Sequence, residues 1–231
     1  RERRTRGQGE AASIAAMIQT VIETHRLDAG RVFITGLSAG GAMASVMLAS
    51  YPERFAGGAI IAGLPFGAAA NVRDALESMR AAPLKMPHQW GDAVRAASDY
   101  RGPWPRISIW HGAADMVVNI SNAQASVAQW ADLHALPLAA AKQEMVDGAV
   151  RLRWDSRLEV HTLQMLGHGT PINPADVGQP GPFIIDAGIS STRRIAEFWG
   201  LVPAAASKPA PKSEVRPAPA RVPPSPQPVL P

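Results

Sequence analysis

The sequence predicts an α/β fold whose mostly parallel sheet is covered by helices on both faces. Segments with the helical spacing of apolar residues alternate with short apolar runs along the chain. The runs are apolar without interruption, as is typical of parallel strands that are buried on both sides. The 231 residues, 46% of them hydrophobic, are enough for one sizeable domain. No apolar run approaches the length of a membrane span.

The elements follow from these patterns in chain order. A helix is predicted at 10–27, where one face carries Ile14, Met17, Ile18, Val21 and Ile22. A buried strand is predicted at 31–35, and the following helix at 41–49 ends at Tyr51-Pro52. The other predicted elements are strands at 55–62 and 107–110, helices at 71–80, 88–98, 121–133 and 192–199, and a hairpin of 150–154 with 158–166.

The basic character of the chain belongs to its two ends. The formal net charge is +4, but residues 1–6 and 204–231 hold eight of the 23 Lys and Arg residues and two of the 19 acidic residues. This leaves 15 basic and 17 acidic residues at 7–203, without the basic face that nucleic-acid binding needs. Nine prolines fall within 204–231. We therefore expect a folded domain at 1–203 and a disordered, Pro-rich tail at 204–231.

Cysteine is absent, which excludes disulfides, thiol catalysis and thiolate metal sites. The first residue is Arg and not Met, so any targeting segment would be missing from this sequence. No pair of His or carboxylate residues has metal-ligand spacing, so we predict neither a metal nor another cofactor.

Residues 36–40 read Gly-Leu-Ser-Ala-Gly and lie between a predicted strand and a predicted helix. This context is the one that the nucleophile elbow of α/β-hydrolases requires. Gly36 and Gly40 are expected to be glycines because a Cβ at either position would collide with a neighbouring element. Ser38 is then the candidate nucleophile, and the backbone N–H of Ala39 is a candidate oxyanion donor. In this class the weakly patterned segment 64–105 is expected to lie over the active site.

A serine nucleophile needs a base and a carboxylate, which follow it in this class in the order acid, then base. Asp115 lies five residues after the predicted strand that ends at Trp110, and it is the candidate acid. His168 follows the acid just beyond a strand and is flanked by glycines, so it is the candidate base.

The other acidic and histidine residues fit these roles less well. Asp147 and Asp155 have turn contexts, and Asp176 and Asp186 come after His168. His25 and His134 are expected to be solvated, His88 begins a helix of the 64–105 segment, His161 is expected to be packed within a strand, and His111 precedes Asp115.

Four separated blocks together resemble the poly(3-hydroxybutyrate) depolymerase family of esterases, which is related to feruloyl and acetylxylan esterases. The blocks are residues 36–44, His111-Gly112 with Asp115, residues 167–171, and residues 186–192 with 198–200. The resemblance covers roughly residues 4–202 and implies a secreted, extracellular serine esterase with an α/β-hydrolase fold. It also implies Ser38 as nucleophile, Asp115 as acid and His168 as base.

The sequence departs from the family before the elbow. Family members carry a longer segment there, with an early strand and a His-Gly-Cys type loop that supplies the second oxyanion N–H, whereas 37 residues precede Ser38 here. We therefore expect a truncated domain that is aggregation-prone and essentially inactive by itself.

Several functions remain open from the sequence. The expected substrate is a hydroxyalkanoate polyester or its oligomers, and feruloyl esters, acetyl esters or the peptides of a serine peptidase with the same fold are alternatives. An inactive binding domain is a further alternative. The sequence predicts neither a nucleic-acid partner nor a membrane span, and it does not define the oligomeric state.

Overall fold

The structure is a computed structural model that describes residues 6–7 and 9–203. The tail predicted at 204–231 lies outside the described residues. The main sheet has six strands in the order β1-β2-β3-β6-β5-β4. The pairs β1–β2, β2–β3 and β3–β6 are parallel, and β6–β5 and β5–β4 are antiparallel. The strands are β1 (Phe33–Leu37), β2 (Gly57–Ile61), β3 (Arg106–Gly112), β4 (Lys142–Val146), β5 (Ala149–Trp154) and β6 (Leu158–Leu163).

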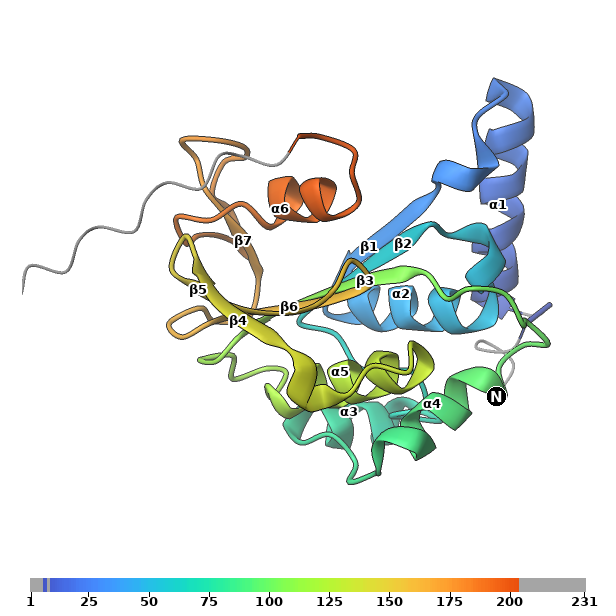
Figure 1. The fold of residues 1–231 in the computed structure, drawn as a ribbon, viewed down its shortest axis with the longest axis horizontal. Coiled ribbons are helices and arrows are strands. Elements are labelled where there is room, and N and C mark those ends of the chain that lie inside the picture. Colours follow the sequence, from blue (N-terminus) through green and yellow to red (C-terminus); the bar gives the residue numbers. More distant parts are fainter. Residues whose placement is uncertain (1–5, 8, 204–231) are drawn as a thin grey trace, which may run out of the picture.

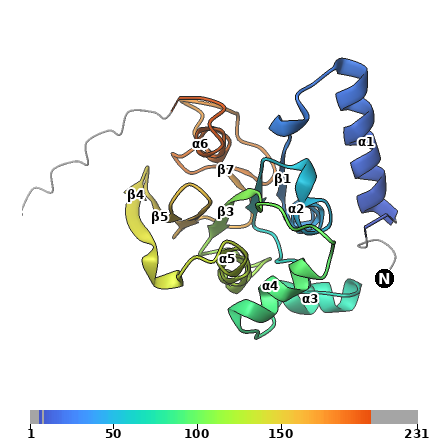
Figure 2. The same ribbon diagram turned by 45° about the vertical axis from the view of Figure 1, so that its right-hand side comes forward.

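Helices cover both faces of this sheet, as predicted. α2 and α5 lie on one face and α6 lies on the other, while α1 packs beside α2 (Figures 1 and 2). The helices are α1 (Gly9–His25), α2 (Ala39–Ser50), α3 (Val72–Arg80), α4 (Pro87–Arg95), α5 (Ser121–Leu133) and α6 (Ser191–Phe198), with short 3-10 turns at Ala29–Arg31, Pro52–Arg54 and Leu138–Ala140.

Each face of the sheet has its own hydrophobic core. On the α2 and α5 side, Met47, Ile107 and Trp130 are completely or almost completely buried in the larger cluster. On the α6 side, Trp110 and Ile189 are fully buried in a second cluster. Because strands β2 and β3 contribute apolar residues to both clusters, their side chains are buried on both faces.

The prediction that the first strand is buried was wrong. β1 lies at the edge of the sheet, its residues are only partly buried, and Thr35 is exposed. β1 also begins at Phe33 and not at Arg31, because Ala29–Arg31 forms a 3-10 turn capped by the Asp28 side chain. β1 therefore presents an unpaired backbone edge within the described part of the chain.

Three strands were not predicted. β4 pairs antiparallel with β5, but its residues are mainly polar and exposed, so it lacks the apolar run of a central strand. β7 (Thr170–Ile172) and β8 (Ile184–Asp186) form a small parallel sheet of their own. The predicted hairpin at 150–154 and 158–166 is present as β5 and β6, although β6 ends at Leu163.

Candidate active site

Ser38 occupies a sharp turn between β1 and α2. Its backbone angles, φ 58° and ψ −117°, are sparsely populated by residues other than glycine. The Ser38 N–H donates to the Ile61 carbonyl of the adjacent strand at 2.9 Å, which fixes the turn against the end of β2. This strained strand-to-helix geometry is that of a nucleophile elbow.

The glycine requirement at this turn was predicted correctly at only one of the two positions. A Cβ at Gly36 would overlap the carbonyl group of Gly40 and lie 2.8 Å from the Gly41 nitrogen. A Cβ at Gly40 would meet nothing within 4 Å, so the expected collision there is absent. Gly41 is the second tightly placed glycine, because its Cβ would lie 3.0 Å from the Ile61 carbonyl oxygen and 3.1 Å from Gly63 Cα. Gly36 and Gly41 therefore bring β1, α2 and β2 close together.

Asp115 lies in the loop after β3, and its side chain is fully buried. Its Oδ1 accepts hydrogen bonds from the backbone N–H groups of Val117 at 2.8 Å and Val118 at 2.9 Å. Its Oδ2 accepts a hydrogen bond from His168 Nδ1 at 2.8 Å. The carboxylate is thus held on one oxygen by its own loop and is directed at the imidazole by the other.

His168 lies in the loop after β6, and its side chain is only 9% exposed. This loop passes over the end of β3 at Gly112, where a Cβ would overlap the Leu166 carbonyl oxygen and lie 2.9 Å from the Gly167 oxygen. Of the two glycines that flank His168, Gly169 is also tightly placed, because its Cβ would lie 2.7 Å from the Phe183 carbonyl oxygen, whereas a Cβ at Gly167 would meet nothing within 4 Å. A glycine at the end of an apolar strand is a sequence signal that could have found Gly112.

The structure brings Asp115 and His168 into direct contact. It places Ser38 at the same end of the sheet, where the parallel strands have their carboxyl ends. The three residues follow the carboxyl ends of β1, β3 and β6, which are parallel strands. No hydrogen bond joins Ser38 to His168 in this structure, and such bonds are often long before substrate binds. Ala39 is the first residue of α2, so its N–H has no partner within the helix.

His111 is a buried neighbour of this pair. Its Nε2–H donates to the Val118 carbonyl at 2.8 Å and lies 3.7 Å from Asp115 Oδ2. Burial lowers the pKa of His111, so the ring stays neutral beside the carboxylate. His111 therefore fastens the loop that carries Asp115, a contact that the sequence did not suggest.

The expectation for the other histidines was correct for His161 and wrong for His134. His161 is buried within β6 and stacks on Trp110, with ring centroids 3.8 Å apart. His134 is only 7% exposed, and its Nε2–H donates to the Pro105 carbonyl at 3.1 Å. Burial and then Arg157 lower the pKa of His134 to about 4, so it is a neutral core residue and not a solvated one.

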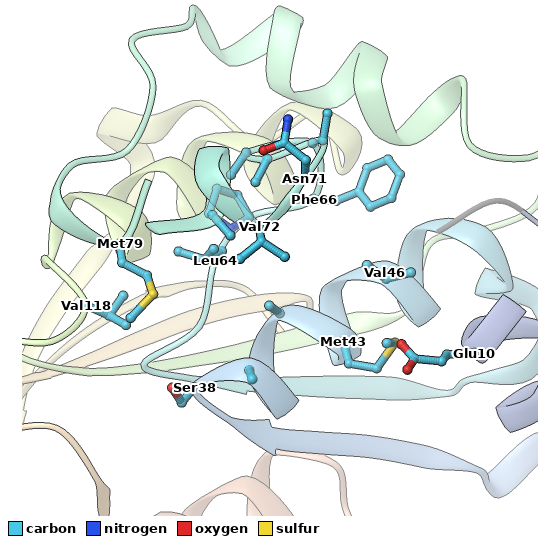
Figure 3. Close-up of a pocket in the computed structure, with 18 residues that line it drawn as sticks. Glu10, Ser38, Met43, Val46, Leu64, Phe66, Asn71, Val72, Met79 and Val118 are labelled. Atoms are coloured by element: carbon cyan, nitrogen blue, oxygen red, sulfur yellow. The ribbon is translucent and has the colours of Figure 1, made fainter. Parts of the chain in front are cut away.

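A pocket opens beside Ser38, between α2 and the segment after β2. Ser38, Ala39 and Met43 line it from the side of α2, and residues 64–72 with Ala75 and Met79 line it from the other side. The close-up in Figure 3 shows Ser38 below the side chains of Leu64 and Met79. The expectation that the 64–105 segment lies over the candidate site is therefore confirmed for its first part.

Neither a metal-binding cluster nor a bilayer-spanning helix is present in the described ranges. No three His, Asp or Glu side chains of 6–7 and 9–203 are grouped so that they could hold a metal ion. No helix in these ranges is long and apolar enough to cross a lipid bilayer.

A mixed sheet flanked by helices, with a strained serine turn at the end of a parallel strand, is the architecture of an α/β-hydrolase. An acetyl xylan esterase from Aspergillus awamori has the same fold, with a TM-score of 0.72 and 24% sequence identity over 86% of this chain and 70% of that one. The model of the family Esterase PHB depolymerase matches residues 1–149. The chain belongs to this family.

Relatives with curated names lie in the same group of esterases. The chain is 38% identical over 208 residues to poly(3-hydroxyalkanoate) depolymerase C of Paucimonas lemoignei. The aligned region covers 86% of this chain and 50% of the relative. It is 32% identical over 181 residues to an acetylxylan esterase of Coprinopsis cinerea, and this aligned region covers 74% of this chain and 48% of the relative. The chain thus spans about half the length of these two relatives.

Proposed function

We propose that this chain carries the catalytic residues of a serine esterase, with Ser38 as nucleophile, His168 as base and Asp115 as the residue that orients the base. The observation that supports this best is the buried Asp115–His168 hydrogen bond at the sheet edge where Ser38 occupies its strained turn. The bond to Asp115 keeps the proton on Nδ1, which leaves Nε2 free to accept one from Ser38.

The reaction is an acyl transfer in two halves. His168 Nε2 takes the proton of Ser38 Oγ while Oγ bonds to the ester carbonyl carbon. The bond from that carbon to the alcohol oxygen then breaks, and His168 gives its proton to the leaving alcohol. Water attacks the acyl-enzyme next, with His168 again as base, and the carboxylic acid leaves as Ser38 Oγ regains a proton.

The Ala39 N–H is the oxyanion donor that we assign, since it lies at the start of α2 directly after the nucleophile. We assign no second donor within the described residues. Residues 1–203 form the esterase domain in this proposal. The expectation that the isolated 231-residue chain is aggregation-prone and inactive stays a prediction, and the unpaired edge of β1 is the feature that supports it.

The substrate that we propose is a hydroxyalkanoate polyester or its oligomers, which the similarity to the depolymerase of Paucimonas lemoignei favours. A feruloyl or acetylxylan ester is the second candidate, favoured by the acetylxylan esterase relative. A serine peptidase of the same fold is the third. In keeping with these esterase relatives, we also infer that the complete protein acts outside the cell.

A phosphonate that labels reactive serines tests the mechanism in the complete protein. Labelling at Ser38 and ester hydrolysis should both be lost in Ser38→Ala, and hydrolysis should also be lost in His168→Ala. Asp115→Asn should keep only about one part in 10⁴ of kcat, because the wrong tautomer of His168 is then favoured. Full activity in His168→Ala together with its loss in His111→Ala would show that the base is misassigned.

A substrate panel then separates the candidates. Hydroxybutyrate oligomers, methyl ferulate, short p-nitrophenyl esters and a p-nitroanilide peptide are compared side by side. We expect the highest kcat/KM for the oligomers. A preference for the anilide would favour the peptidase, and failure of Ser38 to react with the phosphonate would favour a binding domain.

A further inference from the structure

The pocket beside Ser38 is large and apolar. Its volume is about 610 Å³, whereas a water molecule or a methyl group takes up about 30 Å³. The walls are formed by aliphatic, aromatic and thioether side chains, among them Val46, Leu64 and Phe66 (Figure 3). An acetyl group would leave most of this space unfilled.

Charge in the pocket is confined to one end. Among the described residues that line it, only Glu10 has an ionisable side chain, and Figure 3 shows Glu10 beside Met43, at the opposite end of the view from Met79 and Val118. No Lys, Arg or His of the described chain lines the pocket. A carboxylate or phosphate group would therefore find no cationic side chain to compensate its desolvation there.

The position of the base decides which half of an ester can enter this pocket. His168 must reach the alcohol oxygen in order to protonate it, and neither His168 nor Asp115 lines the pocket. On the side of His168, the Phe183 ring meets the imidazole edge-on, with ring centroids 6.1 Å apart, and Phe183 is itself 60% exposed. The alcohol half of the ester fits this exposed side, and the acyl half then points away from His168 into the pocket.

On this geometry, and resting on the proposed function, we propose that the pocket binds the acyl group of the ester. That group is uncharged and longer than acetyl. Ala75 and Met79 determine its maximum length, because both lie on the face of α3 that lines the pocket. They are specificity-determining residues and take no part in the chemistry.

α3 can act as a fixed wall because its carboxyl end is bound to the start of α5. The Asn119 N–H donates to the Met79 carbonyl at 2.7 Å, and Asn122 Nδ2 donates to the Ser78 carbonyl at 2.8 Å. The Ala82 N–H donates to Ser121 Oγ at 2.9 Å. Met79 is thereby held next to Val118, which also lines the pocket.

The experiment fills the pocket from α3 in the complete protein. Ala75→Trp places a large ring on the lining face, and Leu76→Trp is the matched control, because Leu76 is 56% exposed and does not line the pocket. Hydrolysis of p-nitrophenyl acetate, butyrate and octanoate is measured at constant alcohol. A single methylene in an apolar pocket is worth about 10- to 200-fold in kcat/KM. Ala75→Trp should therefore lower kcat/KM for octanoate at least tenfold and change that for acetate less than threefold.

Further measurements separate the possible failures. Leu76→Trp should leave the whole acyl series within about twofold of the wild type. A series of alcohols at constant acetyl should be unaffected by Ala75→Trp, and a loss confined to long alcohols would show that the alcohol half occupies the pocket. Equal losses for acetate and octanoate would also overturn the inference. If the wild type itself showed neither phosphonate labelling nor ester hydrolysis, the proposed function would be refuted, and this inference with it.

A second variant covers the case in which Ala75→Trp does not fold, as judged by its thermal transition. Met79→Ala removes side-chain volume from the pocket, so kcat/KM for octanoate relative to acetate should rise at least threefold. An unchanged ratio in Met79→Ala would refute the role of α3.

Discussion

The packing of the turn that carries Ser38 can be tested with two substitutions, Gly36→Ala and Gly40→Ala. A methyl group at Gly36 would overlap the backbone of Gly40, and carbon atoms need about 3.5 Å between them. Because no flexible side chain can move out of its way, the start of α2 must shift by on the order of 1 Å. Overpacking of this kind costs about 1–3 kcal/mol of unfolding free energy, and a displacement of 1 Å at Ser38, the proposed nucleophile, costs about a hundredfold in rate.

Gly40→Ala adds the same methyl group four residues later, where nothing lies within 4 Å. It should leave hydrolysis unchanged and stabilise the protein by up to about 1 kcal/mol, because alanine favours helix more than glycine does. Urea denaturation and kcat/KM for a short p-nitrophenyl ester, measured on both variants of the complete protein, test the pair. Equal effects of the two substitutions, in either measurement, would refute the assignment of the tight contact to Gly36 and not to Gly40.

Two further predictions concern buried histidines. The pKa of His134 is lowered to about 4 by burial and by Arg157, so between pH 6.5 and pH 4 the unfolded chain takes up a proton that the folded chain does not, and the free energy of unfolding should fall by about 3 kcal/mol. Urea denaturation at pH 7 and pH 4.5 measures this fall; a His134→Gln variant that fell as steeply as the wild type would contradict it. His111→Ala removes the hydrogen bond to the Val118 carbonyl and should lower kcat about a hundredfold by loosening the loop of Asp115. An unchanged kcat would mean that the backbone N–H groups alone hold the carboxylate.

The parallel part of the sheet could be predicted from the sequence because its strands are buried on both faces. β2 and β3 are read directly from apolar runs, and the chain order Ser38, Asp115, His168 identifies residues that the fold gathers at one sheet edge. β4 could not be found in this way, since Lys142–Val146 is mostly exposed and its strand character comes from pairing with β5. Local pattern carries no information about such pairing.

The burial of single polar residues could not be predicted from the sequence either. His134 ends α5 where a solvated side chain is the ordinary expectation, but the Pro105 carbonyl and the neighbouring loop cover it. The free space around Gly40 likewise depends on which residues the fold places near it, and the local sequence does not show this. The motif identified the turn correctly, and only the packed structure distinguishes the glycine that is needed for space from the one that is not.

The hydrogen bonds that join α3 to α5 have a consequence for engineering this enzyme family. Asn119 belongs to the stretch that continues directly from Val118, and Asp115 is held by the N–H of that same Val118. A hybrid that takes residues 64–82 from a relative would therefore join a new pocket wall to the unchanged loop that holds Asp115, the proposed acid. Selectivity and turnover should change together in such hybrids unless positions 119, 121 and 122 are transplanted as well.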